Sequence, residues 1–574
     1  MSGIFGIWRK DQLPLETNHI TAIRNAMRPW GTAEPTCWQT ETMLLGHCQM
    51  DNTPEAHHDQ QPAALGTLRI SADARLDNRV ELCDALNIPH AQRTALPDSV
   101  LIGHAYQKWG QRCTEKLLGA FAFVIWDAHS QTLFMGRDHL GIRPIVYYDT
   151  PNIIIFASDV RAVLAVDRVP ELIDDELLVR YSLLDAQLLQ SRTFFHHIYK
   201  VPPAHSLTAT LSKTTNTRYW HPENTRRLRL KSNAAYVEMM QHHLTEAVTC
   251  RLRTNQPIGA HLSGGLDSSA IAVIAARALR QLGGDIGGLY SWSPAPIDHI
   301  EEQRLIAAVC EQEDLFCHYT PLTPADIAHV ARRDKTRELT AGYAEESVVR
   351  AAAQNQGVRI LLSGWGGDEF ASFNGRGCFS EMFVTGRWWQ LAQALRQEKR
   401  RKQATYYQLA YWQLARPLMP DALYRARGHD ISSLQAHRQQ PITPLEEQIW
   451  RAQSMRLRNR PNAQKMQLAL LACGHLPYRI EAWAVEGLPY QLEYRYPLLD
   501  KRLIEFCLAL PPGQYAQSGW RRFLFRQAMS GILPESVRWH ESKAEPSGSR
   551  RYETVLQQFR QSKRSPPHLG ISSA

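Results

Sequence analysis

One short segment combines glycines, hydroxyls and a carboxylate in a spacing suited to a phosphate chain. Residues 263–269 read Ser-Gly-Gly-Leu-Asp-Ser-Ser, after an apolar run at 258–262 and before a helical pattern at 270–282. Glycines let the backbone approach an anion, and amides and hydroxyls at a helix N-terminus can donate hydrogen bonds to it. Asp267 would repel bare phosphate, but a magnesium ion can bridge the two. The segment therefore predicts a site for a metal-bound polyphosphate, whereas the plainer alternative is a turn that caps an ordinary helix. The residues expected to contact the phosphates are Leu262, Ser263, Gly264, Gly265, Leu266, Ser268 and Ser269.

A second loop of similar composition occurs further along the chain. Residues 362–369 read Leu-Ser-Gly-Trp-Gly-Gly-Asp-Glu and follow the apolar run 359–362. Loops at the carboxyl ends of parallel strands can face each other across a crevice, where the ligands of open α/β sheets bind. We therefore expect Gly364 and Asp368 on the phosphate side of the same site. Neither loop contains a Walker-type or a dinucleotide-binding glycine motif.

The elements that must position these loops are of two kinds. Residues 1 to about 210 alternate short apolar runs with turn residues, which predicts a sheet-rich layer with its clearest strands at 120–126, 132–136 and 152–157. The polar stretch 214–231 is rich in Thr, Asn and Arg, which is typical of a linker. From residue 233 onward, amphipathic helical patterns alternate with strand-like runs at 286–292 and 359–362, and this alternation predicts a parallel sheet with helices on both faces.

Composition limits the class of protein. The 574 residues are 44% hydrophobic, which is enough for at least two cores. The net charge of +9 could indicate binding of nucleic acid, but the basic run 396–402 has no aromatic residues between its charges. We therefore expect this run to form a solvated helix face, and docking of an acidic peptide is the weaker alternative. No apolar stretch of membrane-spanning length and no signal peptide occur, which predicts a cytoplasmic protein without membrane insertion. The ten cysteines show no metal-like spacing, so we expect reduced thiols and no structural metal.

Two further segments carry a resemblance that extends over nearly the whole chain. Residues 117–123 and 136–144 are similar to the glutamine-amidotransferase domain of bacterial asparagine synthetases, and the two loops resemble those of the ATP pyrophosphatase superfamily. The resemblance implies an α/β protein with an N-terminal Ntn-hydrolase-like αββα amidotransferase domain at 1–212 and a linker at 213–232. An ATP-pyrophosphatase-type α/β synthetase domain would follow at 233–560, with a flexible tail at 561–574. Within 136–144, the Arg137–Asp138 pair is expected to form a structural salt bridge.

The resemblance also implies the chemistry of the synthetase domain. ATP would be cleaved between its α- and β-phosphates, with Asp267 and Asp368 holding magnesium on the pyrophosphate. Lys543 would stabilise charge on the phosphates as an acyl-adenylate forms, whereas its plainer alternative is a solvated loop lysine. Residues 289–293, which include Ser291 and lie at the end of the strand-like run 286–292, would lie along the adenine. Arg495 is interpreted as structural, with a phosphate-side contact as the alternative.

The amidotransferase domain departs from the family at the positions that make it a glutaminase. Ser2 stands where the family has a nucleophilic cysteine, and a hydroxyl is a weaker nucleophile than a thiol unless a base activates it. Gln49 replaces the arginine that grips the glutamine carboxylate, and Asp73-Ala74 replaces the Asn-Gly that supplies the oxyanion site. Only Asp98, which would hold the substrate amino group, matches. We therefore predict a retained scaffold without glutaminase activity, with hydrolysis by Ser2 as the minority alternative.

The synthetase loop also departs from asparagine synthetases, which carry a glutamate at the position of Trp365. Trp365 cannot act as acid or base but offers an apolar wall, and it is placed with Glu369 in a predicted substrate pocket. Without a glutaminase, the amine must come from elsewhere. These departures together most resemble the lasso-peptide cyclases, which adenylate an Asp or Glu side chain of a precursor peptide and close a macrolactam with its N-terminal amine. The expected partners are that peptide and a leader-peptide-binding protease or recognition protein, without nucleic acid.

Three alternatives remain open at this point. One is a β-lactam-type synthetase. The next is an ammonia- or glutamine-dependent asparagine synthetase or a related amidotransferase. The last is a nucleotide-binding pseudoenzyme, against which the retained Asp267, Asp368 and Lys543 count.

Overall fold

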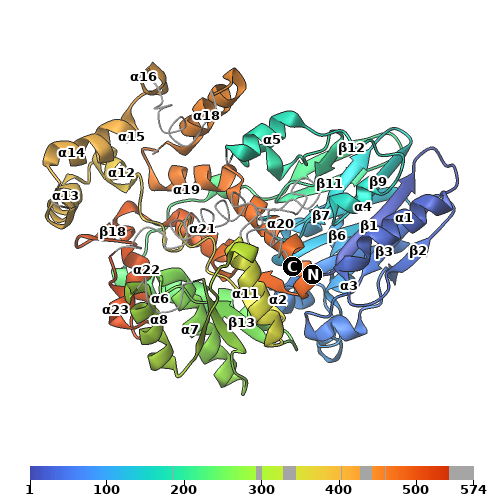
Figure 1. Ribbon diagram of the computed structural model, residues 1–574, viewed down its shortest axis with the longest axis horizontal. Helices are drawn as coiled ribbons and strands as arrows, with labels where there is room; N and C mark the ends of the chain where they lie inside the picture. Colours follow the sequence, from blue (N-terminus) through green and yellow to red (C-terminus); the bar gives the residue numbers. More distant parts are fainter. Residues whose placement is uncertain are drawn as a thin grey trace, which may run out of the picture.

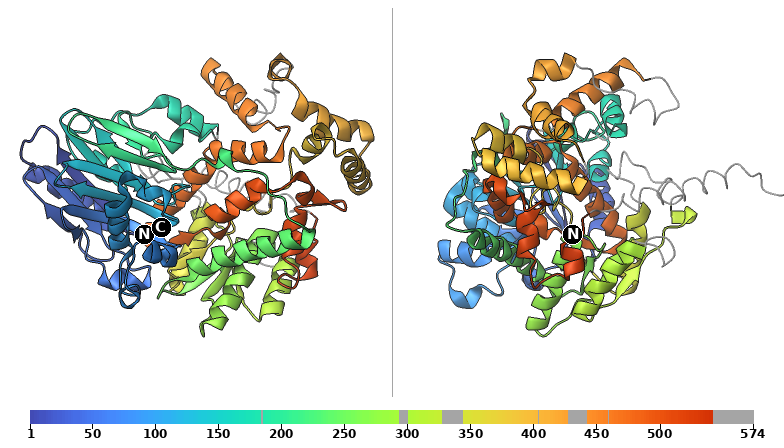
Figure 2. Two further views of the ribbon diagram at one scale, coloured as in Figure 1. Left: turned by 180° about the vertical axis from the view of Figure 1, so that it is seen from behind. Right: turned by 90° about the vertical axis from the view of Figure 1, so that its left-hand side faces the viewer.

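The computed structural model describes residues 1–183, 185–292, 300–326, 344–402, 404–426, 442–458 and 460–541. Within these ranges the chain forms two bodies that lie side by side, the N-terminal one blue to cyan and the C-terminal one green to red (Figures 1 and 2). The expected Lys543 and the expected tail lie outside the described residues. Among the described residues, no helix has both the length and the apolar character that crossing a membrane requires.

The N-terminal body consists of two six-stranded sheets packed face to face, with helices outside them, as the αββα prediction requires. All of the paired strands in both sheets are antiparallel. The first sheet has the order β10 (Ile198–Lys200), β8 (Val146–Asp149), β9 (Ile153–Ala157), β1 (Gly3–Arg9), β3 (Met43–Cys48) and β2 (Thr36–Gln39). The second sheet has the order β12 (Thr214–Arg218), β11 (His205–Ala209), β7 (Thr132–Arg137), β6 (Gly119–Asp127), β5 (Leu68–Leu76) and β4 (Ala63–Leu65). The α-helices of this body are α1 (Thr17–Met27), α2 (Arg79–Ala85), α3 (Asp98–Trp109), α4 (Val160–Leu164) and α5 (Asp175–Ser182).

The apolar run at 120–126 is continuous because strand β6 is buried on both faces. Ala122 and Val124 point into the layer between the sheets. Their neighbours Phe121 and Phe123 pack instead in the core on the other side of the sheet, which includes residues of α3. A strand with one solvent-exposed face would alternate apolar and polar residues, so the continuous apolar run indicates that β6 is a central strand.

Residues 214–218, which the composition predicts as linker, form the edge strand β12 instead. Three of these five residues are threonines, and β-branched side chains favour extended backbone. Four of the five residues are exposed, which explains why the segment looks like a linker in composition.

The C-terminal body is built on a five-stranded sheet in which every pair is parallel, as predicted. Its order is β15 (Cys317–Tyr319), β14 (Gly288–Ser291), β13 (Ile258–His261), β16 (Ile360–Leu362) and β17 (Glu493–Arg495). Strand β13 is central. The next two strands along the chain, β14 and β15, lie on one side of it, and the later strands β16 and β17 lie on the other. The strand order therefore reverses at β13, which places a ligand crevice beyond the carboxyl ends of β13 and β16.

Helices surround this sheet and extend from it as an upper lobe made by α12 to α16 (Figure 1). The helices next to the sheet strands in sequence are α6 (Asn233–Thr249), α7 (Leu266–Gln281), α8 (Ile300–Glu313) and α11 (Ala344–Asn355). The helices of the upper lobe are α12 (Cys378–Val384), α13 (Trp388–Lys402), α14 (Tyr406–Ala410), α15 (Arg416–Leu418) and α16 (Asp421–Ala426). The remaining described elements are α18 (Pro444–Leu457), α19 (Ala463–Ala472), α20 (His475–Gly487), α21 (Lys501–Ala509), the hairpin β18 (Ala516–Gln517) and β19 (Trp520–Arg521), α22 (Phe523–Ala528) and α23 (Glu535–Arg538). The basic run predicted as a solvated helix face lies on α13, where Arg396, Lys399 and Arg400 are exposed.

Arg137, in one of the predicted motifs, joins the two bodies. Arg137 makes no ion pair with Asp138 in the described structure; it pairs with Glu481 of α20, which also pairs with Lys200. Asp138 instead accepts hydrogen bonds from the backbone N–H groups of residues 140, 142 and 143. The expected salt bridge is therefore wrong in its partners, because the partner of Arg137 comes from another domain.

Candidate active site

The first loop lies where the strand order predicts, between the end of β13 and the start of α7. Gly264 has φ +64°, a left-handed conformation that favours glycine. The N–H of Ser263 donates to Oγ of Ser268 at 3.0 Å, and the two hydroxyl oxygens are 2.9 Å apart. These bonds close the loop on the first turn of α7, at a helix N-terminus of the kind that binds anions.

The second loop follows β16 and makes close contact with the first. A Cβ added to Gly364 would lie 2.8 Å from the backbone nitrogen of Ser268, and one added to Gly367 would lie 2.4 Å from the Asp267 carboxylate. Only a residue without a side chain fits at these two points. The glycines therefore allow the two loops to meet face to face.

The two loops line one cleft, together with the ends of the neighbouring strands. Its cavity volume is about 190 Å³. Of the residues predicted from sequence, the cleft lining includes Leu262, Ser263, Gly265, Asp267, Ser268, Ser291, Gly364, Trp365, Asp368 and Glu369. Gly264, Leu266 and Ser269 belong to the same loop and helix start but are not part of the lining.

The two aspartates differ in their surroundings. Asp267 is 7% exposed and its Oδ2 accepts a hydrogen bond from Oγ of Ser372 at 2.9 Å. Asp368 is half exposed and pairs with Arg522 at 2.7 Å. Two carboxylates on facing glycine-rich loops form a hard oxygen donor set, which suits magnesium on a polyphosphate. The residues present therefore fit the ion that the resemblance implies.

Substitution of Gly367 by alanine tests the close contact of the loops. The added methyl would overlap the Asp267 carboxylate and displace it, and a displacement of about 1 Å can cost about a hundredfold in rate. We expect carboxylate-dependent ATP–pyrophosphate exchange to fall by about that factor while the melting temperature changes little. Gly284→Ala is the matched control, because its nearest neighbour would be 3.8 Å away. An ATP–pyrophosphate exchange rate in Gly367→Ala equal to that of the wild type would refute the close contact of the two loops at Asp267.

Glu369 is held by a histidine from α20. Nε2 of His475 lies 2.8 Å from Oε1 of Glu369, and its Nδ1 lies 2.8 Å from Sγ of Cys473. Burial lowers the pKa of His475, but the contacts with Cys473 and Glu369 outweigh it and raise the pKa to about 9.

This histidine predicts a pH-dependent stability. Because its pKa is higher in the folded chain than the usual 6.5, protonated His475 contributes stability below pH 6.5, and that contribution is lost as the pH rises toward 9. The free energy of unfolding of the wild type should therefore fall more steeply across this window than that of His475→Gln. Denaturant titrations at several pH values measure the difference, with the exposed His129→Gln as control. Parallel curves for wild type and His475→Gln would contradict the assignment.

The degenerate amidotransferase residues gather in a second, much smaller cavity. Its lining includes Ser2, Gln49, Asp73, Ala74 and Asp98, so the structure brings all five predicted positions together. Its volume is about 30 Å³, which is space for about two water molecules. A glutamine molecule does not fit without rearrangement.

The pocket side chains at the positions expected to act on glutamine form hydrogen bonds or ion pairs within the protein. Oγ of Ser2 bonds only to backbone atoms of Met50, accepting from its nitrogen at 3.0 Å. The side chain of Gln49 lies 2.9 Å from Nε2 of His47 and donates to Asp51 at 2.9 Å. Burial lowers the pKa of His47 to about 4, so its imidazole is neutral near pH 7. In the described part of the chain, no side chain that could act as a general base is hydrogen-bonded to the Ser2 hydroxyl.

The acidic residues of the pocket are paired with arginines. Asp98 pairs with Arg79 and with Arg253 of the C-terminal body, the latter at 2.9 Å. Burial raises the pKa of Asp98, but these two arginines outweigh it and hold the pKa below its usual value. Asp73 lies 3.5 Å from Arg143, which itself pairs with Glu493 at 3.2 Å. The pocket is therefore filled by an ion-pair network that crosses the domain boundary.

Arg495 belongs to the same network rather than to the phosphate cleft. It is 1% exposed, donates to the backbone oxygens of Asn52 and Arg251 at 2.8 and 2.6 Å, and contacts Glu493 at 2.8 Å. The structural interpretation of this residue is confirmed, and the phosphate-side alternative is wrong.

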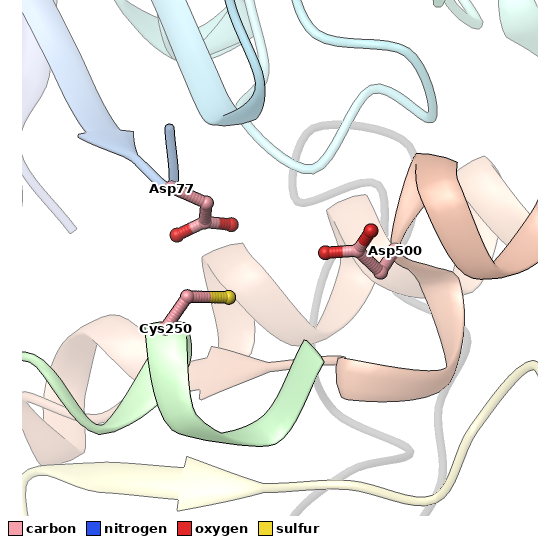
Figure 3. Close-up of side chains that lie close together, drawn as sticks. All are labelled: Asp77, Cys250 and Asp500. Atoms are coloured by element: carbon pink, nitrogen blue, oxygen red, sulfur yellow. The ribbon is translucent and has the colours of Figure 1, made fainter. Parts of the chain in front are cut away.

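A cluster of potential metal ligands lies at the same boundary. The ligand atoms of Asp77, Cys250 and Asp500 all lie within 4.8 Å of one another (Figure 3). Arg251 contacts both carboxylates, Asp500 at 2.8 Å and Asp77 at 3.7 Å, and Arg75 contacts Asp77 at 2.9 Å. Burial raises the pKa of Cys250 to about 11, so its sulfur is a neutral thiol. Arginines supply the positive charge here, and the cluster is an ion-pair network.

Several residues of the cleft between the two loops were not predicted from the sequence. His261, Arg479 and Trp483 line it. Tyr290 and Trp292 line it too, but they fall within the stretch 289–293 that the resemblance places along the adenine. His261 lies within the apolar run 258–262, directly before the first loop, which is a usable signal. Arg479 and Trp483 come from α20, more than a hundred residues after either loop, and nothing local marks them.

Fold and site together define a protein that joins an amidotransferase-type layer to an α/β domain with two facing phosphate-side loops. Residues 1–220 match the glutamine amidotransferase domain family, and residues 239–566 match the asparagine synthase family. The second match covers more than half of the 574 residues, and the chain belongs to the asparagine synthase family.

Three curated relatives illustrate the range of the family. Asparagine synthetase [glutamine-hydrolyzing] 3 of Bacillus subtilis is 29% identical over 281 residues, which cover 48% of this chain and 45% of that protein. Amidase chyE of Penicillium rubens is 26% identical over 373 residues, 58% of this chain and 54% of that protein. A putative asparagine synthetase [glutamine-hydrolyzing] 2 of Methanocaldococcus jannaschii is 26% identical over 299 residues, 51% of this chain and 56% of that protein. The matches span about half the length of these relatives.

Proposed function

We propose that this protein is an ATP-dependent, AMP-forming amide synthetase that takes its amine from the substrate instead of from glutamine. The observation that carries the proposal is the contrast between the two cavities. The cleft with the phosphate-side loops is open, whereas the pocket that would hydrolyse glutamine has a volume of about 30 Å³ and is crossed by the Asp73–Arg143–Glu493 ion pairs.

The proposed reaction has two steps. A substrate carboxylate oxygen attacks the α-phosphorus of ATP, the bond to the bridging oxygen breaks, and pyrophosphate leaves. An amine then attacks the acyl carbon, AMP leaves with the electron pair of the acyl–oxygen bond, and the amine loses a proton. The amides of the 263–269 loop bind the phosphates, and Asp267 and Asp368 would hold magnesium, which offsets the negative charge of the leaving pyrophosphate.

The amine donor is proposed to be the N-terminal amine of a precursor peptide, so that the product is a macrolactam of the lasso type. Trp365 supports this choice, since an indole occupies the position where the resemblance to asparagine synthetases places a glutamate. A peptide also suits an aromatic wall better than free aspartate does. A leader-peptide-binding protease or recognition protein is the proposed partner.

Asparagine synthetase is the second candidate, because two of the relatives described above carry that name. Ammonia would then enter from solvent. The closed pocket and Trp365 count against glutamine-dependent synthesis, but they do not bear on the adenylation step that both candidates share.

Pyrophosphate release tests the proposal. Purified protein is incubated with ATP, magnesium and synthetic peptides that each carry one Asp or Glu side chain and a free N-terminus. We expect pyrophosphate release with at least one peptide, together with a product lighter by one water. N-acetylated peptides are the control, since they should be adenylated without ring closure. Failure of every candidate carboxylate, including free aspartate with ammonia, would remove the synthetase function.

A further inference from the structure

A histidine that the proposed reaction has not yet used lies in the wall of the cleft. His261 is the last residue of β13, lines the cleft and has a side chain that is 11% exposed. Its Nε2 lies 3.1 Å from Oε1 of Glu346 on α11. Among the described residues, Nδ1 of this imidazole has no hydrogen-bond partner. One ring nitrogen is therefore held by a carboxylate, and the other is left for a group bound in the cleft.

The carboxylate that holds His261 is itself fixed. Glu346 is fully buried and accepts hydrogen bonds from the indole N–H of Trp292 at 2.8 Å and from the hydroxyl of Tyr494. Burial raises the pKa of Glu346, but His261 and Arg350 outweigh it and hold the pKa below its usual value. An ionised Glu346 accepts the Nε2 proton of the imidazole, and this tautomer carries its lone pair on Nδ1.

Aromatic packing sets the orientation of the imidazole. Its ring centroid lies 5.7 Å from that of Trp292, 5.8 Å from that of Trp483 and 6.2 Å from that of Tyr494. Arg350, one turn after Glu346 on α11, donates to the Tyr494 hydroxyl at 2.9 Å. The supports come from α11, α20 and β17, so the imidazole keeps its position without a ligand.

The other side chains of the lining that could accept a proton have other tasks. Asp267 and Asp368 would hold magnesium, and Glu369 contacts a histidine of α20. Burial raises the pKa of Tyr290 to about 12, and its hydroxyl is buried without a hydrogen-bond partner in the described part of the chain. Of the lining residues that the structure describes, His261 is therefore the one suited to accept a proton near neutral pH.

We propose that His261 is the general base of amide formation and that Glu346 positions it. The inference rests on the proposed function and adds the residue that removes the proton. As the amine nitrogen bonds to the acyl carbon, AMP leaves with the electron pair of the acyl–oxygen bond, and Nδ1 takes a proton from the nitrogen. The Glu346 carboxylate stabilises the imidazolium that forms, and the proton then passes to solvent.

The substitution His261→Gln separates the two steps of the reaction. With an N-acetylated peptide, we expect ATP–pyrophosphate exchange within about twofold of wild type, because the base acts only after the adenylate has formed. With the free peptide, ring closure should be slower by about a hundredfold or more, as is typical when a general base is lost. Glu346→Gln should show the same split with a smaller loss. His242→Gln, at an exposed histidine of α6, is the matched control and should resemble wild type in both assays.

Hydroxylamine tests the same base with a different amine. Because it is largely neutral near pH 7 and strongly nucleophilic, it captures an acyl-adenylate without a base. Hydroxamate formation from the N-acetylated peptide should therefore be the same in His261→Gln and wild type.

Three results would overturn the proposal. Ring closure by His261→Gln at the wild-type rate would show that this imidazole is not the base. A loss of exchange or of hydroxamate as large as the loss of ring closure would assign His261 to adenylation or to the fold. Absence of exchange in the wild type would instead remove the proposed function, and the base with it.

Discussion

Asp267→Asn is expected to abolish carboxylate-dependent pyrophosphate release while the protein stays folded. Asp267 is buried where the two loops meet, and its carboxylate is one of two that would hold the cation on the leaving pyrophosphate. Loss of that charge removes several kcal/mol of stabilisation from the transition state, so the rate of exchange should fall by about a thousandfold or more. The fold should persist, because the first turn of α7 loses only the small favourable interaction of an acid with the helix dipole, about 1 kcal/mol at most.

ATP–pyrophosphate exchange and circular dichroism are the two measurements for this variant. Asp285→Asn, at an exposed acid after the same helix, is the control and should match wild type in both. An exchange rate near that of wild type in Asp267→Asn would refute the magnesium assignment, and an unfolded variant would show a structural role instead.

Glu493→Gln is expected to destabilise the protein more than any surface substitution. Glu493 is 1% exposed, accepts from Asn52 at 2.7 Å and pairs with Arg143 and Arg495 at 3.2 and 2.8 Å. Burial raises its pKa, but the arginines outweigh this and hold the pKa well below its usual value. Glutamine keeps the shape and removes the charge, which leaves two buried guanidinium groups undercompensated at a cost of roughly 3–5 kcal/mol.

Thermal and denaturant unfolding of Glu493→Gln measure this cost. We expect an apparent melting temperature lower by roughly 3–4 °C, because the entropy of unfolding is spread over 574 residues. Glu115→Gln removes an exposed ion pair with Arg112 and should change it by about one degree, since surface pairs contribute little. If both variants melt like wild type, the buried network does not stabilise the domain boundary.

Local patterns were enough to predict the elements and the phosphate-side loops. The strands around 120–126 and 258–262 and the start of α7 follow from apolar runs and glycine positions that lie within a few residues of one another. The parallel sheet follows from the alternation of strands and helices, and the meeting of the two loops follows from the strand order.

The partners of the charged residues could not be predicted, because they are distant in sequence. Arg137 pairs with Glu481, and Asp98 pairs with Arg253, across a domain boundary that no periodicity reveals. The same reason applies to the contact of His475 with Glu369 and to the stacking of Arg479 on Trp365. Helix α20 looks like an ordinary amphipathic helix in sequence, and only the fold shows that it closes the cleft.

The edge strand β12 shows a different cause of error. Its residues are polar and exposed, so composition indicates a linker, whereas the backbone pairs with β11 over five residues. Edge strands bury few side chains and therefore carry little of the alternation that identifies a strand.

Incorporation of heavy nitrogen measures whether the amide nitrogen of the product comes from the substrate or from glutamine. A candidate peptide is incubated with the protein, ATP, magnesium and glutamine whose side-chain amide carries heavy nitrogen, and the product is analysed by mass spectrometry. We expect a peptide lighter by one water, without heavy nitrogen, and no release of glutamate. Heavy nitrogen in the product, with glutamate formed in step, would contradict it.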